Sequence, residues 1–122
     1  MRDEGTSHHY LPHRRTAAAA LDLTDRLGGL LPSAVRGVVW TTDAPFRQTR
    51  AEVAAYEKAL VLAAEMEAVA LFTVAEYRQV EAAAVVAVAD SLVKPGPCEH
   101  RPETEKALQL ALGAAVQALT EA

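Results

Sequence analysis

The sequence predicts an α/β fold in three layers, with three to four strands and three to four helices. Short apolar runs are typical of strands, and they occur at 35–42, which is rich in β-branched residues, at 60–64 and at 80–89. Segments with the helical spacing of apolar residues alternate with these runs, at 16–31, 49–60, 66–78 and 102–119. Strands that alternate with helices form a mainly parallel sheet with the helices outside it.

The length and composition indicate one domain over residues 1–122, with 1–15 as a loop or arm and 16–122 as the α/β body. A chain of 122 residues buries roughly two-thirds of its unfolded surface. Hydrophobic residues make up 51% and charged residues 23%, which is the balance of an ordinary globular protein. The net charge of −4 offers no basic surface, so we expect no nucleic-acid partner.

The sequence favours a cytoplasmic protein. No apolar run reaches the roughly 18–20 residues that a membrane span needs, and the opening Met-Arg-Asp-Glu-Gly is unlike a signal peptide. The lone cysteine, Cys98, cannot form an intrachain disulfide, which favours a reducing compartment. We therefore expect no contact with a membrane.

The first fifteen residues show neither helical nor strand periodicity and are expected to form a loop. Two alternatives stay open for them: a disordered tail, or a metal site made by His8, His9 and His13. The metal site is the weaker of the two, because no cysteine or second histidine cluster completes a set of ligands.

Local signals set the bounds of the other elements. The first helix is expected to fray at Gly28-Gly29 and end at Pro32, and the pattern Thr49-x-x-Glu52 is a capping box that begins the second. The helix to Arg78 is apolar nearly all round, which predicts burial on more than one side. The run at 80–89 is typical of a central strand buried on both faces. A stiff loop over 93–101 precedes the last helix, which begins at Pro102.

Two carboxylates, Glu65 and Glu67, lie in a run that has no Lys or Arg from 59 to 77. Because an unpaired buried carboxylate costs several kcal/mol, this pair is expected to serve a ligand at the carboxyl end of the strand. The alternative is that the acids only stabilise the start of the following helix, by about 0.3–1 kcal/mol. A third acid, Asp90, follows the apolar run at 80–89, where its alternative role is also that of a cap.

Three ordered motifs connect these acids to a known family. They are Thr41-Thr42-Asp43-Ala44-Pro45-Phe46-Arg47-Gln48-Thr49, Glu65-Met66-Glu67-Ala68 and Ala89-Asp90-Ser91-Leu92. Together they resemble the carboxyl-terminal half of the nucleoside phosphorylases and nucleoside hydrolases, which include uridine phosphorylase, hexameric purine nucleoside phosphorylase and methylthioadenosine nucleosidase. The resemblance covers about residues 2 to 92 and implies a partial, three-layer phosphorylase/hydrolase-like fold.

The resemblance implies a role for each candidate residue in cleaving the N-glycosidic bond of a nucleoside. The ribose would be bound by Glu67, through its 2′ and 3′ hydroxyls, with Met66 against the sugar and Glu65 beside it. The base would be bound by Phe46, Arg47, Tyr10 and His9, and protonated by Asp90, which favours a purine. For Phe46 the alternative is a position in the hydrophobic core. Arg47 has two alternatives, a contact with the substrate or an ion pair with Asp43.

Some positions depart from the family pattern. Ala89 stands where the family usually has Ser, Ala64 stands where Val is common, and a Trp often found after the Asp90 motif is absent. The glycine-containing phosphate loop of the family is also absent, so we expect a chain truncated at its N-terminus with little phosphorolysis of its own. A homo-oligomer or a complementing chain is expected, with inorganic phosphate as co-substrate and no other cofactor or metal.

Three functions therefore remain open on the sequence. The first is an enzyme, or half of one, of the nucleoside phosphorylase class. The second is a catalytically dead remnant that binds a nucleoside or a partner subunit. The third is an unrelated α/β interaction domain in which the acids are helix caps.

Overall fold

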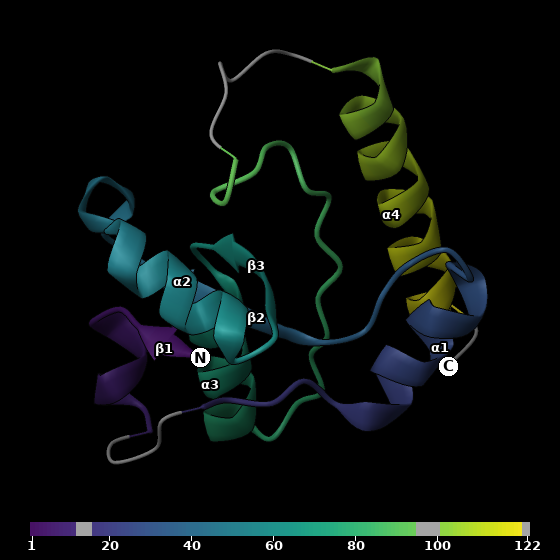
Figure 1. The fold of residues 1–122 in the computed structure, drawn as a ribbon. Coiled ribbons are helices and arrows are strands. Elements are labelled where there is room, and N and C mark those ends of the chain that lie inside the picture. Colours follow the sequence, from purple (N-terminus) through teal and green to yellow (C-terminus); the bar gives the residue numbers. More distant parts are fainter. Residues whose placement is uncertain (12–15, 95–100, 121–122) are drawn as a thin grey trace. The chain divides into compact units, whose positions relative to one another are not determined.

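The computed structural model describes residues 1–11, 16–94 and 101–120 (Figure 1). In these ranges the chain forms a three-stranded parallel sheet and four α-helices, which agrees with the predicted α/β class. Its contacts divide it into two compact units. Unit 1 comprises Met1–Ala20 and Gly37–Ala82, and unit 2 comprises Leu21–Arg36 and Ala83–Ala122.

Unit 1 contains the sheet. Its strands, in spatial order, are β1 (Arg2–Asp3), β2 (Val38–Thr42) and β3 (Val61–Glu65). Thr41 lies opposite Arg2 on one side and opposite Glu65 on the other. The prediction of a loop over 1–15 is therefore wrong at β1 and at a 3-10 helix, η1 (Thr6–His9). A strand of two residues has no periodicity to detect, because it exists only through its pairing with β2.

Each face of this sheet contacts a helix through neighbouring residues of β2. Trp40, which is 2% exposed, stacks on Tyr56 of α2 (Arg50–Lys58) with 4.2 Å between ring centroids. The next residue, Thr41, is fully buried and accepts a hydrogen bond from the Val69 amide of α3 (Ala68–Arg78) at 3.2 Å. Successive side chains of a strand point to opposite faces, so β2 anchors one helix on each.

The helices of unit 1 begin where the sequence predicts, within two residues. The capping box is confirmed: the Thr49 hydroxyl accepts from the Glu52 amide at 3.2 Å, and the Glu52 carboxylate accepts from the Thr49 amide at 2.9 Å. α3 buries Val69 and Thr73, among others, but Leu71 and Tyr77 are exposed. The expected burial on more than one side is found over 68–75, where every residue but Leu71 is buried or half-buried, and not at the exposed residues 76–78.

The strand predicted at 80–89 is not formed. Exposure does alternate along the segment, with residues 83, 85 and 87 half-buried and residues 84, 86 and 88 exposed. The described chain gives it no strand ladder, although the carbonyl of Ala82 accepts from the amide of Ala20 at 2.8 Å. The residues thus have a strand-like alternation without the paired neighbour that makes a strand.

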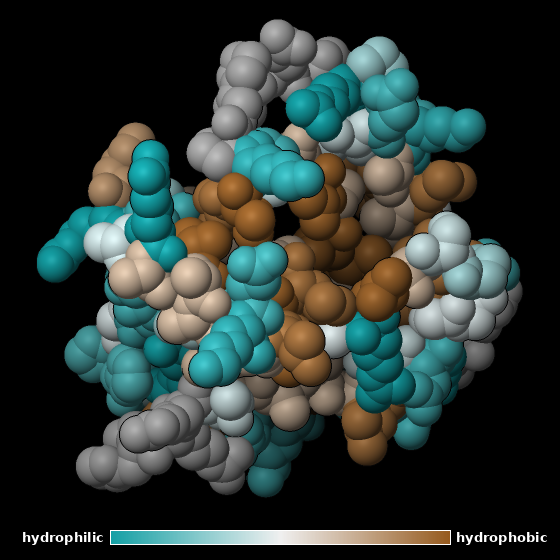
Figure 2. Space-filling model, viewed as in Figure 1, coloured by the Kyte–Doolittle hydropathy of each residue, from teal (hydrophilic) through white to brown (hydrophobic). Residues whose placement is uncertain are grey.

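Unit 2 is built on two helices that contact each other, α1 (Leu21–Leu30) and α4 (Pro102–Thr120). The helix expected over 16–31 is therefore shorter, since 16–20 carry no helix. α4 has the predicted start at Pro102, but the buried side chains of its apolar surface are alanines, at Ala111, Ala114 and Ala118. Its leucines are exposed, and exposed apolar residues are also visible in the space-filling view (Figure 2).

No helix in the described ranges is both long enough and apolar enough to cross a membrane.

Candidate functional site

The three strands bring most of the candidate residues to one edge of the sheet. Because β1, β2 and β3 are parallel, the loops that follow them leave from the same edge. After β1 comes η1 with His9, followed by Tyr10; after β2 comes a 3-10 turn, η2 (Pro45–Arg47); and after β3 come Met66 and Glu67. This strand-end edge, defined as these three loops together with Glu65, is the candidate site.

A buried polar cluster holds the loop after β1. Glu4 accepts hydrogen bonds from the amide of Ser7, at 2.9 Å, and from its hydroxyl. Arg2 donates to the Ser7 hydroxyl at 2.9 Å and to the carbonyl of Leu11 at 2.6 Å. The amide of Gly5 then donates to Asp43 at 3.0 Å, which joins this loop to the loop after β2. Sequence reasoning missed this cluster, and Glu-x-x-Ser is not among the turn or capping patterns that would have indicated it.

Glu65 is engaged with protein donors at both carboxylate oxygens. Its Oε1 accepts the hydroxyl of Thr41, and its Oε2 accepts the amides of Glu67 and Ala68, at 2.7 and 2.6 Å. The first amides of a helix have no partner within the helix, and a carboxylate there also interacts favourably with the helix dipole. Glu65 therefore caps α3 from the preceding strand.

Glu67 lies at the N-cap position of α3 but does not cap the helix with its own side chain. Its residue is exposed, and its carboxylate accepts one hydrogen bond from the amide of Met66 at 3.2 Å. Met66 is exposed next to it. An ionised carboxylate has about four acceptor positions, so Glu67 has capacity for an external pair of hydroxyl donors.

Phe46 and Arg47 are both exposed on the η2 turn after β2. Pro45 occupies the first position of this turn and restricts its backbone. The alternative of a core position for Phe46 is wrong, because its side chain is fully exposed. An aromatic ring held in this way can stack on a flat ligand.

The two remaining candidates after β1 differ in their surroundings. His9 is exposed in η1. Tyr10 packs its ring edge-on against Tyr77 of α3, with 5.6 Å between ring centroids. Tyr10 therefore ties the loop after β1 to α3.

Asp90 belongs to unit 2, where it is exposed at a bend that follows the segment 80–89. Its convergence with Glu67 and Phe46, which belong to unit 1, stays a prediction.

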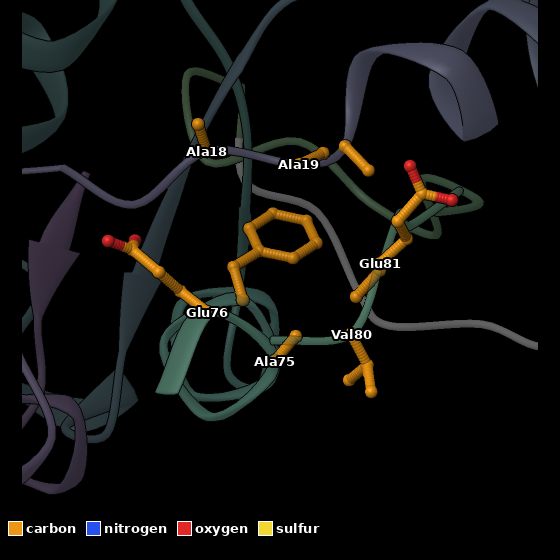
Figure 3. Close-up of a pocket in the computed structure, with 9 residues that line it drawn as sticks. Ala18, Ala19, Ala75, Glu76, Val80 and Glu81 are labelled. Atoms are coloured by element: carbon orange, nitrogen blue, oxygen red, sulfur yellow. The ribbon is translucent and has the colours of Figure 1, made fainter. Parts of the chain in front are cut away.

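A pocket of about 180 Å³ lies elsewhere in unit 1 (Figure 3). It is lined by alanines at 18–20, by Phe72, Ala75 and Glu76 of α3, and by residues 80–82. The carboxylates of Glu76 and Glu81 are on opposite sides of it. None of the candidate residues lines this pocket, so it is separate from the strand-end edge.

No three His, Cys, Asp or Glu side chains in residues 1–11, 16–94 and 101–120 are grouped closely enough to hold a metal ion. Two residues named in the sequence analysis, His13 and Cys98, lie outside these ranges.

One comparison assigns the chain to a family. The family model of the phosphorylase superfamily matches residues 1–122. The chain belongs to the phosphorylase superfamily. No curated protein and no solved structure matches it. In this superfamily member, the parallel sheet and its helices are compatible with part of a phosphorylase fold, and the predicted nucleoside phosphorylase-like origin is confirmed.

Proposed function

We propose that this chain binds a nucleoside at the strand-end edge and cleaves its N-glycosidic bond, or descends from enzymes that do so. The observation that carries this proposal is the exposed carboxylate of Glu67 at the carboxyl end of a parallel sheet, in a member of the phosphorylase superfamily. The proposal includes the family's three-layer arrangement, supported by the helix contact on each face of β2. It also includes a cytoplasmic role in nucleoside salvage or catabolism.

The ribose is assigned to Glu67, with Met66 and Glu65 beside it. Cleavage of the glycosidic bond makes the sugar oxocarbenium-like, so the enzyme must hold the sugar while positive charge develops on it. A carboxylate accepts two vicinal hydroxyls with its two oxygens, and its negative charge favours the developing cation. Met66 supplies apolar contact to the face of the sugar.

The base is assigned to Phe46, with Arg47, Tyr10 and His9 around it. Stacking of a base on an aromatic ring contributes about 1–3 kcal/mol. Phe46 suits this role because its ring is free of the core and its backbone is restricted by Pro45.

Asp90 is assigned as the general acid that protonates N7 of a leaving purine. A proton supplied at the departing base typically contributes 10²–10⁴-fold in rate. This role favours a purine nucleoside over a pyrimidine nucleoside. It requires Asp90 to reach the base that Phe46 holds.

Inorganic phosphate is the proposed co-substrate, with no other cofactor. A homo-oligomer or a complementing chain is part of the proposal because an unpaired sheet edge favours association. Only a complementing chain could supply the glycine-containing phosphate loop that this sequence lacks. The second candidate function follows from the same observation: a catalytically dead protein that binds a nucleoside or a partner subunit without turnover.

Glu67→Gln tests the ribose assignment. We expect the dissociation constant for inosine, measured by calorimetry, to rise at least about tenfold, since a charge-assisted hydrogen bond contributes about 1.5–3 kcal/mol. Binding of 2′-deoxyinosine should change less, because one of the two hydroxyls is already missing. Glu57→Gln is the matched control, since Glu57 is an exposed glutamate of α2 away from the strand ends.

Failure of the wild-type chain to bind any purine or pyrimidine nucleoside at millimolar concentration would reject the proposed function. Turnover of inosine with and without phosphate then separates the two candidates. An active chain should lose at least about a hundredfold in rate with Asp90→Asn while its dissociation constant is kept. Binding without turnover identifies the catalytically dead form.

A further inference from the structure

We propose that Thr41 and Glu65 are positioning residues that set the place of Glu67, and that Glu65 acts on the sugar only through Glu67. This inference rests on the proposed function and deepens it. It assigns to the hydroxyl of a buried threonine, which the sequence did not single out, a part in recognising the ribose.

The hydroxyl of Thr41 is the centre of the arrangement. Thr41 lies in β2 and is fully buried. Its hydroxyl donates to Oε1 of Glu65 and accepts from the amide of Val69 at 3.2 Å. A hydroxyl has one hydrogen to donate, so this contact fixes which oxygen of Glu65 faces the strand.

With Oε1 held by Thr41, the other oxygen of Glu65 is directed at the start of α3. Oε2 accepts the amides of Glu67 and Ala68, at 2.7 and 2.6 Å. Together with the hydrogen bond from the Val69 amide to Thr41, these contacts satisfy three successive amides at the N-terminal start of α3. The backbone of Glu67 is thereby held between a strand of the sheet and the first turn of α3.

The consequence differs for the two glutamates. Both oxygens of Glu65 are occupied by protein donors, whereas the side chain of Glu67 leaves the held backbone toward solvent. A carboxylate that must meet two hydroxyls at hydrogen-bond distance gains from a fixed backbone, because displacements near 1 Å are costly at such sites. Thr41 therefore contributes to the sugar contact without touching the ligand.

Thr73 provides a matched control in the same unit. It is also fully buried, but its hydroxyl donates to the carbonyl of Ala70 in its own helix, at 3.0 Å. Thr41→Val and Thr73→Val each remove one buried hydroxyl with little change in shape. Only the first removes the hydrogen bond between β2 and the Glu65 carboxylate.

The first readout is amide hydrogen exchange measured by NMR on the unliganded chain. In Thr41→Val we expect exchange at Glu67, Ala68 and Val69 to accelerate at least about tenfold, the equivalent of 1.4 kcal/mol. Thr73→Val should leave these three amides unchanged, and Thr41→Ser, which keeps the hydroxyl, should restore their protection. Equal exchange at these amides in Thr41→Val and Thr73→Val overturns the proposal.

The second readout is the ratio of dissociation constants for 2′-deoxyinosine and inosine. A structural loss weakens both ligands equally and keeps the ratio, whereas a displaced Glu67 lowers the ratio toward one. We expect the lower ratio in Thr41→Val and the wild-type ratio in Thr73→Val and Thr41→Ser. An unchanged ratio in Thr41→Val, with faster exchange, reduces Thr41 and Glu65 to a helix cap and overturns their role toward the sugar.

Glu65→Gln repeats both measurements if Thr41→Val does not fold. It keeps the shape of the side chain but removes its charge, so the same changes are expected in the same direction. If the wild-type chain binds no nucleoside, the proposed function fails and takes the sugar role with it, while the exchange data still decide whether Thr41 holds the start of α3.

Discussion

Two places in this chain have the same sequence pattern, an apolar run that ends in an acid, and the structure treats them differently. At Val61–Glu65 the run is a strand, and its terminal acid is bonded to the strand beside it and to the helix after it. At 80–89 the run alternates in exposure but forms no ladder, and Asp90 at its end is exposed. The difference is the neighbour: β3 lies beside β2, whereas the described chain provides the second run with no paired strand.

This comparison shows what an apolar pattern can and cannot specify. In an extended backbone successive side chains point to opposite faces, so their exposure alternates wherever one face of the segment is packed against the protein. A strand also needs a partner for its amides and carbonyls, and the identity of that partner is not contained in the run itself. The following predictions test how far the two regions differ.

The largest effect is expected for a change at the centre of the formed sheet. Trp40→Ala removes a buried ring that stacks on Tyr56 and donates to Asp3 at 3.1 Å. We expect a loss of about 3–5 kcal/mol in the free energy of unfolding, measured with urea. The counterpart at 80–89, Val88→Ala, should cost less than about 1 kcal/mol because Val88 is largely exposed.

A similar loss for both substitutions would mean that Val88 is buried in solution, and the contrast between the regions would disappear.

Proline substitutions test the pairing of the backbone directly, and their expected effect on stability is smaller. Val39 lies in β2 opposite Ala63 of β3, and Val86 lies in the segment without a ladder. Val39→Pro should destabilise the chain by roughly 2 kcal/mol or more, since a proline ring within the middle strand of the sheet disturbs the backbone that pairs with its neighbours. Val86→Pro should cost less than half as much in the same urea titration.

Equal costs for the two prolines would show that 80–89 pairs with another strand in solution, as the sequence predicts, and would restore the strand.

The smallest effect concerns the cap of α2, the helix that connects β2 to β3. Thr49→Ala removes a confirmed capping hydroxyl and should cost about 1 kcal/mol at neutral pH. Thr120→Ala, at the last residue of α4, should cost less, because that hydroxyl donates only to carbonyls of its own helix, at 3.1 Å. Urea titrations of both variants check the difference.

The same cap predicts a pH dependence. The amide of Thr49, and after it the Thr49 hydroxyl, lower the pKa of Glu52 from its ordinary value of 4.5. A carboxyl with a lowered folded pKa stabilises the chain above its unfolded pKa and loses that contribution as the pH falls through the folded one. Stability should therefore decline on acidification below about 4.5, and Glu52→Gln should remove part of that decline. If the free energy of unfolding of Glu52→Gln fell with pH just as that of the wild-type chain does, the predicted contribution of Glu52 would be contradicted.

Much of the fold could be predicted from local signals. Residues close together in the sequence predict three features: the capping box at Thr49, the strand β2 and the helix start at Pro102. The failures share a different origin. β1 is two residues long and exists by pairing with Thr41 and Thr42, about forty positions later in the chain, and the run at 80–89 lacks such pairing.

In the candidate site, too, features made by consecutive residues could be predicted and contacts between distant residues could not. The position of Glu67 at a strand end could be predicted from the motif around it, because a strand, an acid and a helix are consecutive there. The hydrogen bond from Thr41 to Glu65 could not, since it joins residues on neighbouring strands. The cluster of Glu4 with Ser7 is local and was missed because β1 was not recognised.

One feature of the strand-end edge has a consequence for ions in the surrounding solution. Among the described residues of these strand ends and the loops that follow, five are acidic, Asp3, Glu4, Asp43, Glu65 and Glu67, and two are arginines, Arg2 and Arg47. The formal charge of these residues is negative, and like charges repel over a screening length of about 10 Å at 0.1 M salt. A neutral nucleoside enters such a field without penalty, whereas a phosphate dianion is repelled. Added salt should therefore ease the approach of phosphate to this edge, in contrast to the weakening that salt causes at a basic anion site.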